Sequence, residues 1–307
     1  MRRRPSSRAT VTAAIACAVL LVVGCEARVH GSPPNDPAPL TMRAPQGTVE
    51  PPPAAPPGQP AAAFDGLDAR TKQATADAAK SGAHIETVVL DRNTGQRISN
   101  GDNSTFPIAS VAKLFIADDL LLQESKGQTT LSAADHKSLE VMLRSSDDSA
   151  AQSFWDRSGG NAIIARVVAR YGLSGTTAPY DGHWDVTTST ASDLVRYYDM
   201  LLSGGGGLPP GQANVILSNL AQSTATGGDG YPQRFGIPEG LYADPVAVKQ
   251  GWFCCWNGAN QLHVSTGVIG SERRYVMAIS SLEPDDASTA RTTITQAVKT
   301  MFPGGKI

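Results

Sequence analysis

The sequence has little of what builds a metal site. It contains four cysteines and five histidines among 307 residues, and no HExxH or CxxC spacing occurs. Zinc ligands in proteins usually stand at such short spacings along the chain. We therefore expect neither a metal site nor a cofactor.

An excess of positive charge is also missing, since the formal net charge is −2 at pH 7. The first 24 residues hold four arginines and no acidic residue, so the remainder carries 22 basic against 28 acidic residues. Domains that bind nucleic acid normally present a basic face. This balance argues against nucleic acid as a partner.

Long apolar runs are absent except near the start, where residues 11–23 form a run too short for a membrane span, which needs about 20 residues. Arginines precede the run, as in a signal peptide over residues 1–24. Gly24-Cys25 at its end resembles a bacterial lipobox, which implies cleavage before Cys25 and lipidation of its thiol. The alternative is an ordinary signal peptide with a chance cysteine. We expect an extracytoplasmic protein, anchored to the cell membrane by this lipid.

Residues 25–63 are rich in proline and alanine, which favours extended polyproline conformations over a packed core. We interpret this segment as a stalk, with a proline-rich ligand for a partner protein as the alternative. The folded domain is then expected over residues 64–307.

Predicted strands stand at both ends of that domain, and helices stand between them. Apolar periodicity and turn residues predict these elements: a helix over 64–80, a hairpin over 87–99, helices between 110 and 222 (one of them over 161–171), a strand over 243–255, a second hairpin with strands over 261–269 and 273–282, and a helix over 287–302. This order predicts an α+β fold in which one antiparallel sheet is built from both ends of the domain and a helical subdomain is inserted.

Ser110 and Lys113 stand three residues apart at the start of an apolar helical run. Positions i and i+3 share one helix face, so Oγ and Nζ are expected to meet. A serine hydroxyl is a poor nucleophile until a base takes its proton, and lysine is such a base once desolvation or nearby cations lower its pKa. The alternative is a helix start with an incidental serine and lysine.

Two further motifs follow Ser110-x-x-Lys113 in the chain: Ser146-Asp-Asp148, and Lys249-Gln-Gly251 inside a predicted strand. In this order the sequence resembles the serine β-lactamase and penicillin-binding protein superfamily, nearest to its class A β-lactamase-like branch. The resemblance extends over about residues 64–302 and implies the β-lactamase-like form of the α+β fold.

The resemblance implies a catalytic role for three side chains. Ser110 would attack a β-lactam or peptide carbonyl, Lys113 would take its proton, and Ser146 would pass a proton to the leaving nitrogen. Lys249 would attract the substrate carboxylate and help lower the pKa of Lys113. The backbone N–H groups of Ser110 and Trp252 would form the oxyanion hole.

The resemblance also implies that Asp148, Gln250 and Gly251 bind substrate beside Lys249. Two of these residues depart from the family pattern. Asp148 replaces an asparagine, so it cannot donate to a substrate carbonyl, and its charge would favour charged Lys113. Gln250 replaces a threonine or serine, and we expect its amide to donate to the substrate instead. Gly251 would keep the strand edge open.

The loop over residues 178–185 lacks the glutamate that clears the acyl-enzyme in class A enzymes. Asp181, His183 or Asp185 are candidates to activate water there, and the alternative is that they only cap or line the loop.

Cys254 and Cys255 are adjacent, and outside the membrane thiols tend to oxidise. We expect a disulfide between them, with two free buried thiols as the alternative. The stretch from Trp252 to Trp256 is either an aromatic wall of the cleft, with a redox-sensitive element, or ordinary strand packing.

Together these features predict a monomeric, lipid-anchored acyl-transfer hydrolase that acts on β-lactams or cell-wall peptides through a Ser110 acyl-enzyme with slow deacylation. The alternative is a non-catalytic envelope module that retains the fold and binds a small molecule or peptide.

Overall fold

The computed structural model describes residues 64–101 and 103–307. The predicted signal peptide, Cys25 and the stalk lie outside the described residues. Within the described part, no helix combines the length and apolarity that a bilayer crossing requires.

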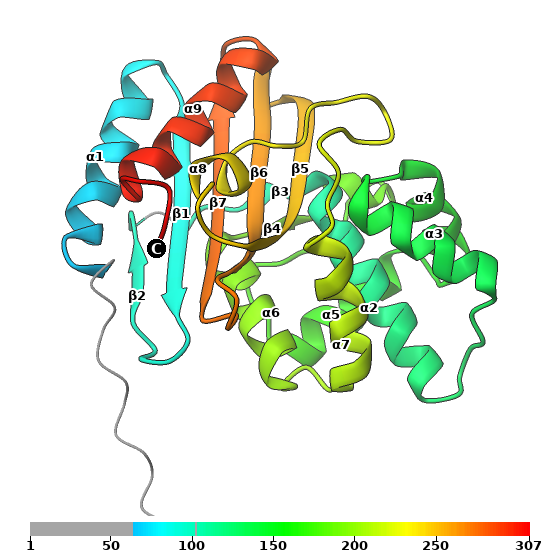
Figure 1. The fold of residues 1–307 in the computed structure, drawn as a ribbon. Coiled ribbons are helices and arrows are strands. Elements are labelled where there is room, and N and C mark those ends of the chain that lie inside the picture. Colours follow the sequence, from blue (N-terminus) through cyan, green and yellow to red (C-terminus); the bar gives the residue numbers. More distant parts are fainter. Residues whose placement is uncertain (1–63, 102) are drawn as a thin grey trace, which may run out of the picture. The chain divides into compact units, whose positions relative to one another are not determined.

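One antiparallel sheet joins the two ends of the domain, in the strand order β2-β1-β7-β6-β5. Its strands are β1 (His84–Asp91), β2 (Arg97–Ser99), β5 (Val246–Trp256), β6 (Asn260–Ile269) and β7 (Tyr275–Glu283). The early strand β1 pairs with the late strand β7 along its whole length, as Figure 1 shows. The predicted α+β fold with a sheet built from both ends is confirmed.

Two helices from opposite ends of the domain cover one face of this sheet. They are α1 (Leu67–Lys80) and α9 (Ala287–Met301). The short helix α8 (Ile237–Gly240) lies on the same face. Alternate strand positions such as Ile279 face them, because strand side chains point to opposite faces in turn. Leu67 and Val298 pack into the same apolar cluster, so the ends of the domain share one core.

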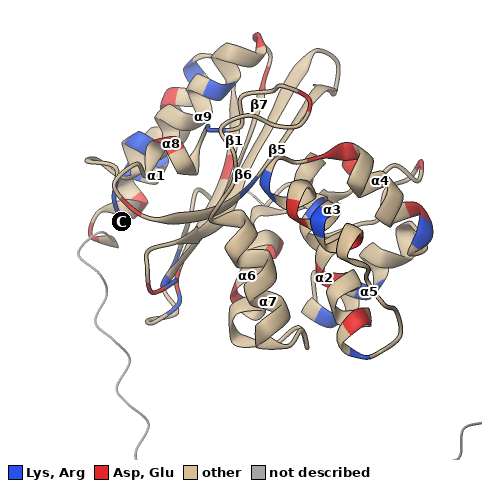
Figure 2. Ribbon diagram, turned by 45° about the vertical axis from the view of Figure 1, so that its right-hand side comes forward, with Lys and Arg blue, Asp and Glu red and all other residues tan. Residues whose placement is uncertain are grey.

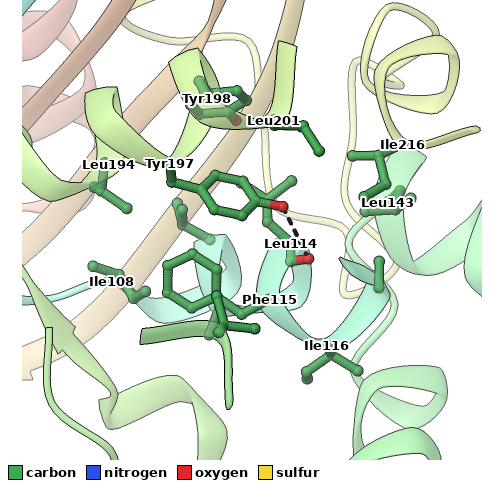
Figure 3. Packing of buried hydrophobic residues seen from close by; sticks show 14 of the residues in the cluster. Ile108, Leu114, Phe115, Ile116, Leu143, Leu194, Tyr197, Tyr198, Leu201 and Ile216 are labelled. Atoms are coloured by element: carbon green, nitrogen blue, oxygen red, sulfur yellow. Dashed lines mark hydrogen bonds between the residues drawn. The ribbon is translucent and has the colours of Figure 1, made fainter. Parts of the chain in front are cut away.

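The other face carries the inserted helical block. Its elements are β3 (Phe106–Pro107), η2 (Ala109–Val111), α2 (Ala112–Ser125), α3 (Ala133–Arg144), α4 (Asp148–Arg157), α5 (Asn161–Tyr171), η3 (Trp184–Val186), β4 (Thr188–Ser189), α6 (Ala191–Ser203) and α7 (Pro210–Leu220). Helix α2 is buried from Ala112 to Leu122, so the other helices surround it. Figure 3 shows Phe115 against Tyr197, whose hydroxyl donates to Leu114 O at 3.4 Å.

Two buried carboxylates on α2 attach it to α5. Asp118 accepts from the hydroxyl of Tyr171 at 2.5 Å and forms an ion pair with Arg170. Asp119 accepts from Nε and Nη2 of Arg166 at 2.8 and 2.7 Å. Burial raises the pKa of Asp118, and the charge of Arg170 opposes this rise. Such paired contacts fix the register of α2, which begins at the serine-lysine motif.

Thr190 and Asp193 have the Thr-x-x-acidic spacing that predicts a capping box, and the start of α6 forms only half of one. Thr190 caps the helix as expected, because its Oγ1 accepts from Asp193 N at 3.1 Å. The Asp193 carboxylate, however, accepts from Gly175 N and from Thr176 Oγ1, both at 2.8 Å. A loop that packs on the helix end supplies these donors, and they replace the local partner of a capping box.

Candidate functional site

Ser110 and Lys113 meet where η2 passes into α2. Lys113 Nζ donates to Ser110 Oγ at 2.7 Å, and both side chains are buried. Ala109, just before the serine, has a φ of 47°, in the region that L-residues rarely adopt. The expected juxtaposition of hydroxyl and amine is therefore present, in a water-poor environment.

Ser146 comes from the turn between α3 and α4, and it lies between two lysines. Lys113 Nζ donates to its carbonyl oxygen at 2.6 Å and lies 3.2 Å from its Oγ. Lys249 Nζ, from β5, donates to the same Oγ at 2.7 Å. Segments more than 100 residues apart in the sequence thus place two serines and two lysines in one hydrogen-bonded chain.

Burial shifts the pKa of both lysines. The pKa of Lys249 lies well below its usual value because the side chain is buried and because Lys113 adds a second positive charge. Burial also lowers the pKa of Lys113, and the carboxylate of Asp148 opposes this effect. The amines are therefore more readily neutral than a lysine in water.

Asp148 is the direct partner of Lys113. Its Oδ1 accepts from Nζ at 2.6 Å, while the aspartate side chain is 66% exposed. The ring of Trp184 lies 4.6 Å from the same Nζ and covers it from another side. As expected from the sequence, a carboxylate at this position favours the charged form of Lys113. In Figure 2 a blue band on β5 faces the red start of α4, where this charge cluster lies.

Gln250 does not offer its amide to the cleft, contrary to the expectation that it would donate to a substrate. Its side chain is buried, with 2% of the residue exposed, and Nε2 donates to Phe235 O at 2.5 Å. Successive strand residues face opposite sides of a sheet. Lys249 and Gly251 face the helical block, so Gln250 points to the other side.

Gly251 is a point of close approach between β5 and the serine-bearing turn. A Cβ added there would lie 2.5 Å from Ile108 O and 3.3 Å from the Ala109 Cβ. Gly251 therefore has a packing role, in addition to the predicted role of keeping the strand edge open.

We expect Gly251→Ala to destabilise the fold by about 2 kcal/mol, because backbone of η2 or β5 must move to admit a methyl group. Thermal or urea unfolding measures this. Gly211→Ala is the matched control, since a Cβ there meets nothing within 4 Å and φ is not positive. Equal stability of the two variants would contradict the packing role.

Trp252, the next residue along β5, lies on the sheet face away from the helical block and belongs to an aromatic cluster there. Trp252 stacks on Tyr231, with ring centroids 4.9 Å apart, and its Nε1 donates to Asp229 Oδ2 at 3.1 Å. The Tyr231 hydroxyl bonds His263 Nε2 at 2.7 Å and accepts from Arg291 at 2.8 Å. Asp229 and Tyr231 stand in a turn-rich loop without a recognisable motif, so no sequence signal pointed to them.

Cys254 and Cys255 are bonded to each other and exposed, in agreement with the expected disulfide and not with two buried thiols. The structure favours the strand-packing alternative for this stretch, because Phe253 packs on the helical core and Trp252 on the core of the opposite face, while the disulfide stands at the surface. The aromatic wall of the cleft stays a prediction.

A cavity of about 360 Å³ lies beside the serine-lysine cluster, and it is lined by Asp148, Ser149, Gln152, His183, Trp184 and Asp185. Two of the three candidate water activators of the loop thus border the cavity. Asp185 is half-buried, and this burial raises the pKa of its carboxyl. Asp181 is exposed and accepts from His183 N at 3.0 Å, which is the loop-capping alternative.

Among residues 64–101 and 103–307, no three histidine, cysteine, aspartate or glutamate side chains stand together as a metal would require.

Comparison with known proteins agrees with this fold. The model of the β-lactamase enzyme family matches residues 69–134. The chain is 55% identical over 322 residues to "Putative lipoprotein LppW" of Mycobacterium tuberculosis and of Mycobacterium bovis, and the match spans all of both chains.

Solved structures share the fold at lower identity. A β-lactamase from Xanthomonas campestris has a TM-score of 0.64 at 17% identity, covering 77% of this chain and 97% of that one. The structure of PBP-A has a TM-score of 0.64 at 18% identity, covering 80% and 96%. The chain therefore belongs to the family of the LppW lipoproteins, and it has the β-lactamase-like fold.

Proposed function

We propose that this protein is a serine acyl-transfer hydrolase that acts on β-lactams or cell-wall peptides through a Ser110 acyl-enzyme. The observation that carries the proposal is the unbroken chain of contacts from Ser110 Oγ through Lys113 Nζ and Ser146 Oγ to Lys249 Nζ. Each atom in it lies within 3.2 Å of the next, so protons have a short path.

The chemistry follows from these positions. Neutral Lys113 takes the proton of Ser110, whose Oγ then bonds to the substrate carbonyl carbon. The backbone N–H groups of Ser110 and Trp252 stabilise the negative oxygen of the tetrahedral intermediate. The bond from carbon to the leaving nitrogen breaks, and that nitrogen takes a proton from Ser146, which Lys113 resupplies.

When Lys113 is neutral, its repulsion no longer lowers the pKa of Lys249, so Lys249 can keep its proton. Its positive charge then suits the carboxylate of a penicillin or of a peptide terminus. The cavity beside Asp148 and Asp185 gives room for the remainder of the substrate. Gln250 takes no part in this scheme, since its amide is used within the fold.

Deacylation is proposed to be slow, because the loop over residues 178–185 offers no glutamate. Asp185 is the loop carboxylate best placed to replace it, since it lines the cavity and is half-buried. A raised pKa makes a carboxylate a better proton acceptor for water. The stable acyl-enzyme of a penicillin-binding protein is therefore the expected end point with many β-lactams.

The location is proposed to be the outer side of the cell membrane, through a lipid on Cys25. The relatives' name supports this, as does the lipobox-like Gly24-Cys25. A purely binding module is the less favoured alternative, because binding does not need two desolvated lysines beside two serines.

The test is intact-mass analysis of the full chain incubated with a penicillin. We expect a stable mass increase equal to one penicillin, and Ser110→Ala should lose it completely. Consumption of the drug without an adduct, still dependent on Ser110, would keep the acyl-enzyme and show fast deacylation, with Asp185→Asn as the next variant. Absence of both adduct and consumption with penicillins and with acylated cell-wall peptides would refute the proposal.

A further inference from the structure

A small cavity on the opposite side of the sheet from the helical block collects positive charge. It has a volume of about 230 Å³ and lies along α9, beside the segment that leads into α8. Arg234, Arg291 and Lys299 line it, and Glu239 is the only acidic residue among its lining. Its wall therefore carries an excess of two positive charges.

The three cations come from two separate elements that converge. Arg291 and Lys299 stand eight residues apart on α9, a little over two turns, so both lie within one broad face of the helix. Arg234 stands in the loop before α8. Because α8 packs against α9, the Arg234 side chain reaches the same cavity. Figure 2 shows blue bands along α9 near α8.

Much of the hydrogen-bonding capacity of these side chains is unused within the described residues. Arg291 is held in place by Tyr231, which accepts from one Nη at 2.8 Å and lies under the guanidinium at 4.9 Å. Arg234 makes one long bond to Pro238 O at 3.4 Å, and Lys299 lies 3.5 Å from Glu239. A guanidinium has five N–H donors, so most point to no protein acceptor.

We propose that this cavity binds a phosphate group, either as free phosphate or as the phosphate of a glycerol phosphate headgroup. Guanidinium groups match phosphate oxygens in a bidentate geometry, and the excess of two positive charges suits an anion with one or two negative charges. The concave shape admits one such group and holds the cations around it. The amide of Gln296, also in the lining, supplies a further donor.

The site is separate from the Ser110 cluster, and its ligand is not a substrate of that cluster. The proposal therefore stands or fails independently of the acyl-transfer function.

The test is isothermal titration of the full chain in a nonionic detergent at low ionic strength, with inorganic phosphate and with glycerophosphoglycerol as separate ligands. We expect binding of at least one of them. Tighter binding of inorganic phosphate identifies a free anion as the ligand, and tighter binding of the diester identifies a lipid headgroup. High salt should weaken both, since the attraction is electrostatic.

Variants of exposed lining residues locate the site. Arg234→Gln and Lys299→Gln should each weaken binding about tenfold, as expected for loss of a charge-assisted hydrogen bond. Glu239→Gln should tighten it several-fold, because it removes the only negative charge of the lining. Lys137→Gln on α3 removes an exposed lysine elsewhere and should change nothing.

Circular dichroism checks that each variant is folded. The proposal is refuted if neither ligand binds the unmodified chain, or if the Arg234, Lys299 and Glu239 variants bind like the Lys137 variant. A gain of affinity on Glu239→Gln cannot arise from loss of folding, so it separates a local effect from a structural one.

Discussion

Replacing Lys113 by methionine is expected to slow acylation of Ser110 about a thousandfold, while the protein remains folded. A positioned general base contributes roughly 10²–10⁴-fold to such a step. Lys113 Nζ is the only amine within hydrogen-bond distance of Ser110 Oγ among the described residues. Without it the serine proton has no nearby acceptor of suitable pKa, and the hydroxyl remains a weak nucleophile.

The fold should tolerate this change because methionine fills the space of the lysine stem. Breaking an ion pair is strongly destabilising when the charge left behind is buried and unpaired. Asp148, the partner left behind, is largely exposed and stays solvated. The melting temperature should therefore hold or rise as the activity falls.

Time-resolved intact-mass measurement with a penicillin gives the acylation rate, and thermal unfolding gives the stability. Lys126→Met, at the exposed C-terminal end of the same helix, is the matched control and should alter neither. An unchanged acylation rate in Lys113→Met would remove this lysine from the mechanism, and a collapse of the fold would refute the packing argument.

Asp148→Asn is expected to accelerate acylation about tenfold near neutral pH. The carboxylate lies 2.6 Å from Lys113 Nζ and opposes the fall of the lysine pKa that burial causes. Removing its charge lets the pKa of Lys113 fall further, so a larger fraction is neutral at a given pH. A change of one pKa unit corresponds to a factor of ten in that fraction.

The pH profile gives the sign of this effect. Below the pKa of Lys113 the acylation rate rises with pH, and in Asp148→Asn this rise should move to lower pH, with the two rates converging at high pH. Stability should show the same linkage. A buried lysine with a depressed pKa binds fewer protons folded than unfolded, so the variant should be less stable at low pH and recover as pH rises.

Acylation rates measured across pH, beside unfolding at the same pH values, test both statements. Asp156→Asn on the same helix removes a carboxylate away from the cluster and serves as control. A profile that does not move relative to the unmodified protein would mean that Asp148 does not set the protonation of Lys113.

Much of the architecture was predictable because its signals are local. Turn residues between β-branched runs predicted the pairing of β1 with β2 and of β6 with β7, and apolar periodicity predicted α5 over Asn161–Tyr171. The spacing of Ser110 and Lys113 on one helix face predicted their contact. These features depend on periods of two or 3.6 residues, which a short stretch of sequence contains in full.

By itself the sequence determined the order of strands and helices, the adjacent cysteine pair, and the presence of two serines and two lysines in family order. Only the tertiary structure decided where partners from distant segments meet. One example is the stacking of Tyr231 on Trp252. Another is the Asp193 carboxylate, which accepts from Gly175 and Thr176 and not from the backbone of its own helix end. The physical reason is that a local pattern specifies which face of an element is apolar. The packing of several such faces sets which polar groups come within hydrogen-bond distance.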